Sequence, residues 1–244
     1  MGSWDRAGLV GEVRARPRIC QDFHGSICAP DFSTMTEIEC RVFQSSDTDA
    51  VVHLLAKAFS ATEPPAVAMG LTQHEIENFV GLLCPKAAAE GLTIVAHAVD
   101  SEQIAGVMLT DDFAAPPELA AGQFSEKFLP IFAMLETLDG QYRTKRSIAP
   151  GEHLHLFMLG VDERFAGRGV AQEMVSACIA NGYQKGFQHA VTEATGVVSQ
   201  HLFRKLGFRE QLRVSYRDYQ YDGRSVFASI RGHDATILMD RAIP

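Results

Sequence analysis

The chain has 244 residues and a formal net charge of -8, with 46% hydrophobic and 21% charged residues. This composition is ordinary for a globular protein with a sizeable core, and the acidic balance argues against bulk nucleic-acid binding. No apolar run approaches the ~18–20 residues of a membrane helix. We therefore expect a cytoplasmic protein that binds neither nucleic acid nor membrane, as a monomer or a homodimer. Mild acidity is also compatible with a cationic small substrate.

The cysteines give no metal or disulfide signature. Cys20, Cys28, Cys40, Cys84 and Cys178 are scattered without CxxC or metal-ligand spacing. Their odd number and their spread favour free thiols in a reducing compartment. We expect no bound metal.

The first 34 residues differ from the rest. Gly, Pro, Arg and Ser recur without a sustained apolar period, and there is no apolar core of a signal peptide. We expect a disordered N-terminal extension at 1–34 and one domain at 35–244. Met35, followed by TEIECRVF, resembles a natural chain start.

From residue 37 the predicted strands and helices alternate. A strand at 38–43 comes first, and Asp47 is expected to cap the helix that follows. The stretch ATEPPAVAMGL at 61–71 is expected to be a loop. Thr72 then caps a second helix, which carries its apolar residues on one face.

A β-hairpin is predicted next, because apolar strands at 92–99 and 104–110 flank a tight DSEQ turn. Two prolines precede a helix at about 118–138, whose phenylalanines face either the core or a substrate pocket. The later predicted elements are strands at 154–161, 190–193, 211–216 and 236–239, and helices at 170–185 and 197–206. This order indicates a single α/β domain.

A glycine-rich turn after the 154–161 strand is the most informative feature. Gly167-Arg168-Gly169 follows the strand and opens the 170–185 helix. At such a turn, free backbone N–H groups and the positive end of the helix dipole point toward an anion. The turn therefore predicts a phosphate-bearing ligand.

Two other phosphate motifs fit less well. A dinucleotide fingerprint needs a small residue where Gln172 stands, and a strand that ends directly at the first glycine. Here the six residues from Val161 to Ala166 separate the strand end from Gly167. A Walker loop would need GK[ST], which is absent. The remaining alternative is an ordinary glycine-containing loop.

Two motifs resemble the GNAT superfamily of N-acetyltransferases. Its central pattern, V-x-P-x-x-[Q/R]-G-x-G-x-[G/A], is similar to VDERFAGRGVA at 161–171, and its second motif is similar to SQHLFRKLGF at 199–208. The chain resembles most the arylalkylamine N-acetyltransferases of the insect and nematode type, whose E-P-[LP] loop is matched by Glu63-Pro64-Pro65. The resemblance implies an acyl-CoA N-acyltransferase fold of the α/β class, with a mixed central sheet splayed between its fourth and fifth strands and flanked by helices.

The same resemblance implies acetyl-CoA as the acyl donor. The turn would hold the pyrophosphate, and the backbone of the 159–161 strand would hold the pantetheine arm and polarise the acetyl carbonyl. The usual Gln or Arg of the motif falls on Ala166, so Arg164 or Arg168 would supply the cation. The implied donor-binding residues are Leu159, Gly160, Val161, Arg164, Gly167, Arg168, Gly169, Val170, Ala171 and Phe203.

Glu63 is the expected general base. An amine at neutral pH is mostly protonated, so a group must take its proton directly or through water. Glu63 precedes two prolines that fix its backbone, and it matches the glutamate of the resembled branch. The alternative is a solvated loop carboxylate.

Ser199 is expected to assist the leaving thiolate. Many members of the superfamily use a tyrosine for this step, and here that position is Phe203, which cannot donate a proton. Ser199 lies one helical turn earlier on the same face, and Thr195 lies four residues before it. The alternative for Ser199 is a helix cap.

His155 is a third catalytic candidate. Strand periodicity places it on one face with Phe157, Leu159 and Val161. The resemblance implies a role in proton relay, which suits the pKa of an imidazole. A structural histidine is the alternative.

Together these features predict an N-acetyltransferase that moves acetyl from acetyl-CoA to a primary amine of a small, arylalkylamine-like molecule. The transfer would take place by direct attack in a ternary complex. The alternatives are a polyamine or protein-amine acetyltransferase, or a catalytically weak CoA-binding sensor, which Ala166 and Phe203 would allow.

Overall fold

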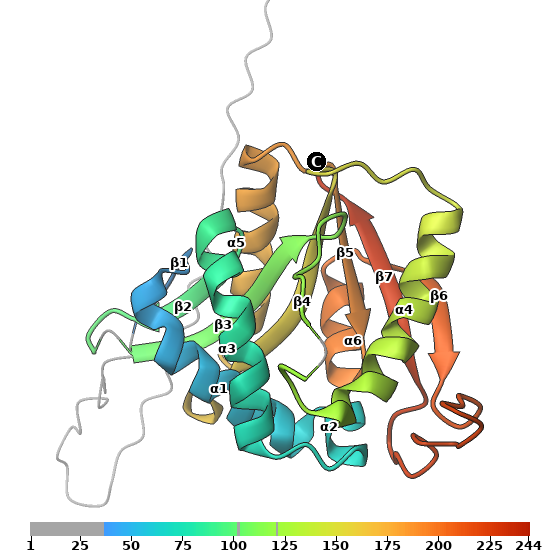
Figure 1. The fold of residues 1–244 in the computed structure, drawn as a ribbon. Coiled ribbons are helices and arrows are strands. Elements are labelled where there is room, and N and C mark those ends of the chain that lie inside the picture. The colour runs from blue at the N-terminus through green and yellow to red at the C-terminus, as the bar shows by residue number, and fades with distance from the viewer. Residues whose placement is uncertain (1–36, 102, 121) are drawn as a thin grey trace, which may run out of the picture. The chain divides into compact units, whose positions relative to one another are not determined.

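A computed structural model describes residues 37–101, 103–120 and 122–244. The predicted extension at 1–34 lies outside these residues. Within them, seven strands form one sheet (Figure 1): β1 (Ile38–Val42), β2 (Ile94–Ala98), β3 (Gln103–Asp112), β4 (His153–Val161), β5 (His189–Ala194), β6 (Arg209–Ser215) and β7 (Ala235–Ala242). The α-helices are α1 (Thr48–Thr62), α2 (Pro64–Ala68), α3 (Gln73–Glu90), α4 (Leu129–Thr144), α5 (Val170–Gln184) and α6 (Val197–Lys205). Three short 3-10 turns are η1 (Ser45–Asp47), η2 (Glu126–Phe128) and η3 (Glu163–Phe165).

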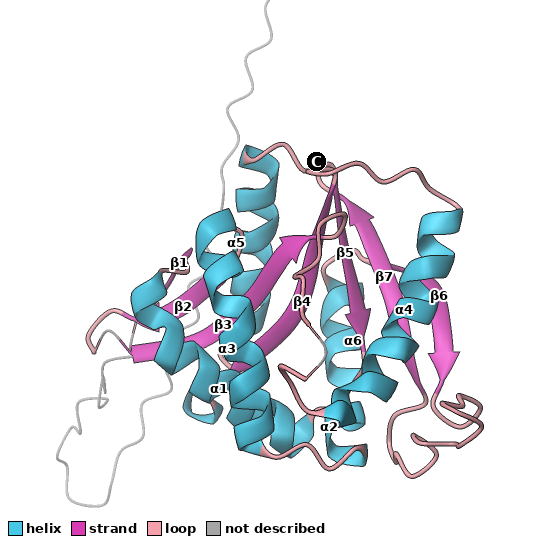
Figure 2. Cartoon of the chain, viewed as in Figure 1, coloured by secondary structure: helices cyan, strands magenta, loops and turns pink. Residues whose placement is uncertain are grey.

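The sheet has the order β1-β2-β3-β4-β5-β7-β6, and β4 and β5 form its parallel pair. This pair is short. Backbone pairing starts at His153↔His189 and ends at His155↔Val191, although both strands continue. The two strands then diverge, as Figure 2 shows. The predicted splay between the fourth and fifth strands, and with it the mixed α/β fold, is confirmed.

A β-bulge in β4 changes which side chains share a face. Leu109 pairs with Met158 and Thr110 with Leu156, so Phe157 is an extra residue in β4. His155 and Phe157 lie together, with ring centroids 5.3 Å apart. Leu159 and Val161 instead pack with Leu154 and Leu156. The prediction of one face for residues 155 to 161 is therefore wrong beyond the bulge, because the extra residue reverses the alternation.

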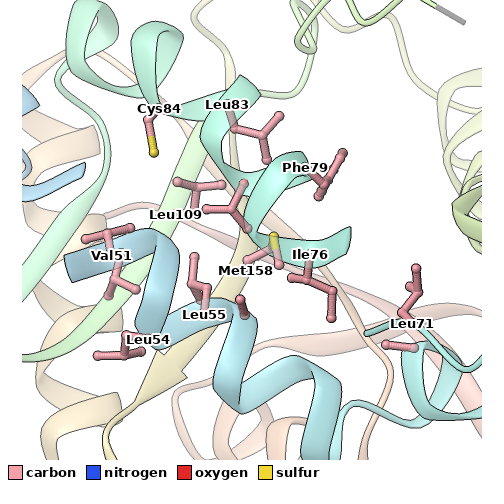
Figure 3. Packing of buried hydrophobic residues seen from close by; sticks show 14 of the residues in the cluster. Val51, Leu54, Leu55, Leu71, Ile76, Phe79, Leu83, Cys84, Leu109 and Met158 are labelled. Atoms are coloured by element: carbon pink, nitrogen blue, oxygen red, sulfur yellow. The ribbon is translucent and has the colours of Figure 1, made fainter. Parts of the chain in front are cut away.

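Helices cover both faces of the sheet. On one face α1 and α3 pack against each other and over β3 and β4, and Figure 3 shows Leu55, Phe79, Leu109 and Met158 meeting there. On the other face α5 packs over β3 and β4, and α6 over β5. Both cores rest on the central strands, so the position of β4 is fixed from two sides.

The predicted loop at 61–71 is mostly helical. Helix α1 extends to Thr62, and α2 begins at Pro64. Proline is favoured at the first positions of a helix, where its missing N–H costs no hydrogen bond. Glu63 between the two helices caps α2 by accepting a hydrogen bond from the Ala66 N–H.

The predicted helix at 118–138 begins later and ends later, as α4 at Leu129 and Thr144. Gly122 has a φ of 86°, which a right-handed helix does not allow. Ser125 caps the short turn η2 in front of α4, and Pro130 suits its first turn.

The starts of α1 and α3 differ in their side-chain caps. Thr72 and Glu75 form a capping box at the start of α3, as predicted for Thr72. Asp47 does not cap α1 with its side chain. Its carboxylate accepts a hydrogen bond from the Gln44 N–H and pairs with Arg41 at 2.7 and 2.8 Å. Within the described residues, no helix has both the length and the apolarity to cross a membrane.

Candidate active site

A cavity of about 780 Å³ opens where β4 and β5 separate. Its walls include both strands, the glycine turn before α5, one face of α6, the junction of α1 and α2, and aromatic residues of α3, η2 and α4. The volume is in the range of sites that bury a small molecule or cofactor. The separation of β4 and β5 therefore opens a cavity that is large enough for a ligand.

The glycine turn lies at one end of this cavity. Gly167 and Gly169 have φ values of 74° and 86°, and Gly169 is the N-cap of α5. This left-handed region favours glycine because it has no Cβ. Both glycines line the cavity, as do Val170 and Ala171. The N-terminus of a 15-residue helix thus faces the cavity with backbone N–H groups, which suits an anion.

The two arginines expected to hold the phosphates lie outside the cavity wall. Arg164 forms a bidentate pair with Asp162, at 2.9 and 2.6 Å. The Arg168 guanidinium lies 5.5 Å from the centre of the Phe165 ring. Lys205 and His201 of α6 line the cavity instead. Sequence reasoning missed them, although their spacing of four places both on one helix face.

The cavity-facing part of β4 keeps free backbone groups. In the described part of the chain, its pairing with β5 ends at His155. Leu159 and Val161 line the cavity. Gly160 faces α1, where an added Cβ would lie 2.8 Å from Leu54 and 2.9 Å from Leu55. The helix therefore packs directly on the strand and fixes its position.

The Thr192 hydroxyl bridges the two strands where they diverge. It donates a hydrogen bond of 2.8 Å to the Leu156 carbonyl, on the far side of the last backbone pair. A side chain thus occupies an acceptor that a continued sheet would pair with backbone. The contact stabilises β4 and β5 at the point where they separate.

Glu63 lies in the cavity wall at the start of α2. Its carboxylate accepts a hydrogen bond of 2.5 Å from the Ala66 N–H and one from the Thr195 side chain. Burial disfavours the charged form and raises the pKa of Glu63 to about 7, against the lowering effect of these two hydrogen bonds. A carboxylate with this pKa is suited to exchange protons at neutral pH.

Thr195, which follows β5, contacts Glu63 and is itself held by Tyr216, which follows β6. The Tyr216 hydroxyl donates to the Thr195 carbonyl at 2.7 Å and accepts from the Thr236 hydroxyl at 3.0 Å. No local pattern predicts these contacts, since Thr195, Tyr216 and Thr236 come from different segments. These hydrogen bonds fix the position of Thr195, whose side chain donates to the Glu63 carboxylate.

Ser199 and Phe203 both line the cavity from α6. The Ser199 hydroxyl donates to the Gly196 carbonyl at 2.9 Å and accepts from the Gly196 N–H at 3.3 Å. In this arrangement it caps the start of α6. Phe203 is buried against Phe208, with ring centroids 5.0 Å apart.

His155 does not line the cavity. Its two ring nitrogens contact carboxylates on both sides: Nδ1 lies 2.9 Å from Asp111 and Nε2 lies 2.7 Å from Glu193. Burial disfavours the charged ring, but the charges of Glu193 and Asp111 outweigh burial and raise the pKa of His155 well above its usual range. Glu193 is the member of this group that lines the cavity.

Four phenylalanines form an aromatic part of the cavity wall. Phe79, Phe128, Phe132 and Phe157 line it, and come from α3, η2, α4 and β4. The Phe79 ring lies 4.6 Å from Phe128 and 5.4 Å from Phe132, between centroids. These phenylalanines therefore belong to both the core and the cavity.

Among the described residues, no group of three or more His, Cys, Asp or Glu could hold a metal ion.

The fold is shared with several solved structures. The C-terminal condensation domain of Ebony, in complex with beta-alanyl-dopamine, is 18% identical with a TM-score of 0.79, over 86% of this chain and 100% of that one. Arylalkylamine N-acetyltransferase 2 from Aedes aegypti is 23% identical with a TM-score of 0.69, over 85% and 100%. The polyamine N-acetyltransferase of Drosophila melanogaster, which catalyses the formation of N-acetylagmatine, is 20% identical with a TM-score of 0.68, over 84% and 100%.

A sequence model of the acetyltransferase (GNAT) family matches residues 86–208, which is half of the 244 residues. The matched region contains the splayed strand β4, the glycine turn and the Gly207-Phe208 end of the second motif. The resemblance to this family that the sequence indicated is thereby confirmed. The chain belongs to the acetyltransferase (GNAT) family.

Proposed function

We propose that this protein transfers an acetyl group from acetyl-CoA to the primary amine of a small, arylalkylamine-like molecule. The observation that carries the proposal is Glu63, a carboxylate with a pKa of about 7. It lines the same cavity as the glycine turn and the free edge of β4. A proton acceptor, an anion-binding turn and free backbone donors then serve one reaction centre.

The donor half of the cavity fits acetyl-CoA, which supplies an activated acetyl group. Gly167, Gly169, Val170 and Ala171 bind the pyrophosphate through backbone N–H groups. Lys205 adds a cation from α6, in place of Arg164 and Arg168. The free edge of β4 at Leu159 and Val161 pairs with the amides of the pantetheine arm and donates to the thioester carbonyl, where charge builds in the transition state.

The acceptor half is aromatic. Phe79, Phe128, Phe132 and Phe157 offer ring faces and edges to a bound ring, an arrangement that aromatic pairs favour. The Aedes aegypti and Drosophila melanogaster relatives act on an arylalkylamine and on agmatine, according to their names.

The chemistry is a direct attack. Glu63 takes a proton from the ammonium group of the acceptor, and the amine nitrogen then attacks the thioester carbon. The carbon–sulfur bond breaks, and the second nitrogen proton goes to the thiolate. Ser199 assists this last transfer once rotation of its side chain frees the hydroxyl from Gly196. No covalent enzyme intermediate forms.

A thiol-release assay with acetyl-CoA tests the proposal. Arylalkylamines, polyamines and amino acids serve as acceptors, and Glu63→Gln is compared with wild type. We expect turnover to be highest on arylalkylamines and to fall by about 10²–10⁴-fold in Glu63→Gln. Glu118→Gln, which changes an exposed carboxylate outside the cavity wall, serves as the matched control and keeps full activity. Undiminished turnover in Glu63→Gln would remove Glu63 from the mechanism.

A further inference from the structure

A buried group of charged side chains joins three strands beside the cavity. His155 of β4 contacts Asp111 of β3 at 2.9 Å and Glu193 of β5 at 2.7 Å. The side chains of His155 and Asp111 are 11% exposed, and that of Glu193 is 3% exposed. We call these three residues the strand tie. Ion pairs this buried are retained only with good geometry, because each charge has lost its water.

The strand tie stands where two irregularities of the sheet begin. His155 forms the last backbone pair between β4 and β5, with Val191. Two residues later, Phe157 is the extra residue of the bulge against β3. On one side β4 separates from β5, and on the other its register with β3 shifts. Backbone hydrogen bonds alone therefore fix the position of β4 weakly at His155.

A third carboxyl group lies next to the strand tie. Asp139 of α4 hydrogen-bonds Glu193, and burial together with the charge of Glu193 raises the pKa of Asp139 to about 9. Asp139 is therefore protonated at neutral pH and donates to the Glu193 carboxylate. The rings of Phe113 and Phe157 complete the surroundings of His155, with centroids 5.4 and 5.3 Å from its ring.

The geometry excludes His155 from contact with a ligand in the cavity. Both ring nitrogens are engaged, and His155 is not among the residues that line the cavity. His155 can therefore affect the reaction only indirectly, through the position of strand β4. The next residues of that strand, Met158 to Val161, provide the free backbone on the cavity side.

We propose that His155 is a positioning residue: by tying β4 to Asp111 and Glu193, it fixes the orientation of the β4 backbone that polarises the acetyl carbonyl. The inference rests on the proposed function. Hydrogen-bond donors to a developing oxyanion act only at the right distance and direction, and a misplacement of about 1 Å costs roughly 100-fold in rate. The tie acts on the catalytic step more than on the binding of either substrate.

The test compares two variants with a matched control. His155→Gln removes the charge but keeps polar contacts, and Asp111→Asn loosens the tie from the side away from the cavity. Should His155→Gln not fold, Asp111→Asn still decides the question. Asp139→Asn is the control, because an amide of similar shape replaces a neighbouring carboxyl and leaves the three residues of the strand tie unchanged. None of the three residues lines the cavity.

The readout is the infrared stretching band of the thioester carbonyl in bound, 13C-labelled acetyl-CoA, measured with kcat and the Kd of acetyl-CoA. In wild type and Asp139→Asn we expect the band below its position in free acetyl-CoA. In His155→Gln and Asp111→Asn we expect it to return toward the free position, with kcat lowered by about tenfold or more and the Kd changed by less than about threefold.

Folded variants that keep the wild-type band and kcat would overturn the inference. A fall in kcat with an unmoved band would overturn it as well, since the loss would then have another cause. The proposed function fails in a different way: wild type would show no bound acetyl-CoA band, or no displacement of it, before any variant is compared.

Discussion

At the residue scale, the chemistry of Glu63 is set by its surroundings. Its carboxylate caps α2 through the Ala66 N–H and meets the Thr195 side chain across the cavity wall. These hydrogen bonds favour the charged form, but burial outweighs them, so the pKa rises from 4.5 to about 7. The same glutamate on a solvated loop would be fully ionised at neutral pH and would be a weaker base.

The raised pKa predicts a pH profile. We expect kcat to rise with pH through about 7, because Glu63 must lose its proton before it can accept one from the amine. In Glu63→Gln this limb should disappear from the residual activity. Steady-state rates at saturating substrates between pH 5.5 and 9 would check this. A limb that persists unchanged in the variant would assign it to another group.

The same shift predicts a change in stability. The folded protein holds the Glu63 proton up to about pH 7, whereas the unfolded chain releases it near 4.5. The contribution of Glu63 to stability is thus fully present below 4.5 and is lost as pH rises through 7. Chemical denaturation should find Glu63→Gln more stable than wild type at pH 8 and similar to it at pH 4. A variant less stable than wild type at pH 8 would contradict the burial argument.

At the element scale, the glycine turn joins a strand to a helix and presents that helix N-terminus to the cavity. Gly167 has a φ of 74°, in open space where an added Cβ would meet nothing within 4 Å. The glycine is therefore favoured by its backbone conformation and not by a steric limit on a side chain. Gly223 provides a matched position, with a φ of 73° and equally open surroundings, away from the cavity wall.

These two glycines allow a paired experiment. Gly167→Ala and Gly223→Ala should each destabilise the protein by about 1–2 kcal/mol, since an L side chain is strained in the left-handed region. Only Gly167→Ala should also weaken coenzyme A binding, because its Cβ would project at the anion. Calorimetric titration with coenzyme A would check this. Equal affinities in the two variants would show that the turn does not hold the phosphates.

The strand β4 illustrates a limit of reasoning within one element. Strand periodicity predicts that His155, Phe157, Leu159 and Val161 share a face, but the bulge at Phe157 reverses the alternation for the last two. The bulge is decided by the register with β3, which lies in a separate segment. A pattern within β4 cannot reveal it.

At the scale of the whole molecule, the cavity is assembled from segments that are distant in the sequence. Glu63 comes from the junction of α1 and α2, the glycine turn from the start of α5, and the basic side chains of Lys205 and His201 from α6. Acidic side chains line the part near β5 and α2, whereas basic side chains lie on α6. This separation suits an anionic donor at one end and a cationic acceptor at the other.

A ligand that joins these segments should stabilise the whole protein. At a concentration of about 100 times its Kd, coenzyme A should add about 2.7 kcal/mol to the free energy of unfolding, which corresponds to a rise of about 5–10 °C in Tm for a chain of this size. Thermal unfolding with and without coenzyme A measures the effect. Glu63→Gln should keep the full rise, because Glu63 acts on the acceptor. No rise in wild type would exclude coenzyme A as the ligand.

Short-range physics determined what the sequence predicted correctly. The alternation of strands and helices, the capping box at Thr72 and Glu75, and the glycines of the turn depend on side-chain period and backbone sterics within a few residues. The resemblance to the GNAT family rests on the same local motifs, and it implied the separation of the fourth and fifth strands that the structure has. The predicted loop at 61–71 was wrong, because Pro64 begins a helix there. The predicted helix at 118–138 had wrong ends, because Gly122 has a positive φ that a right-handed helix does not allow.

The tertiary structure alone decided which groups meet. It brought Thr195 to Glu63, placed Asp111 and Glu193 on the two sides of His155, and put Lys205 in the cavity wall in place of Arg164. Each of these placements joins segments far apart in the chain, and the first two shift the pKa of Glu63 and of His155. Sequence fixes the type and the local geometry of a residue. Solvent exclusion and the partners of a buried charge exist only once distant segments have packed together.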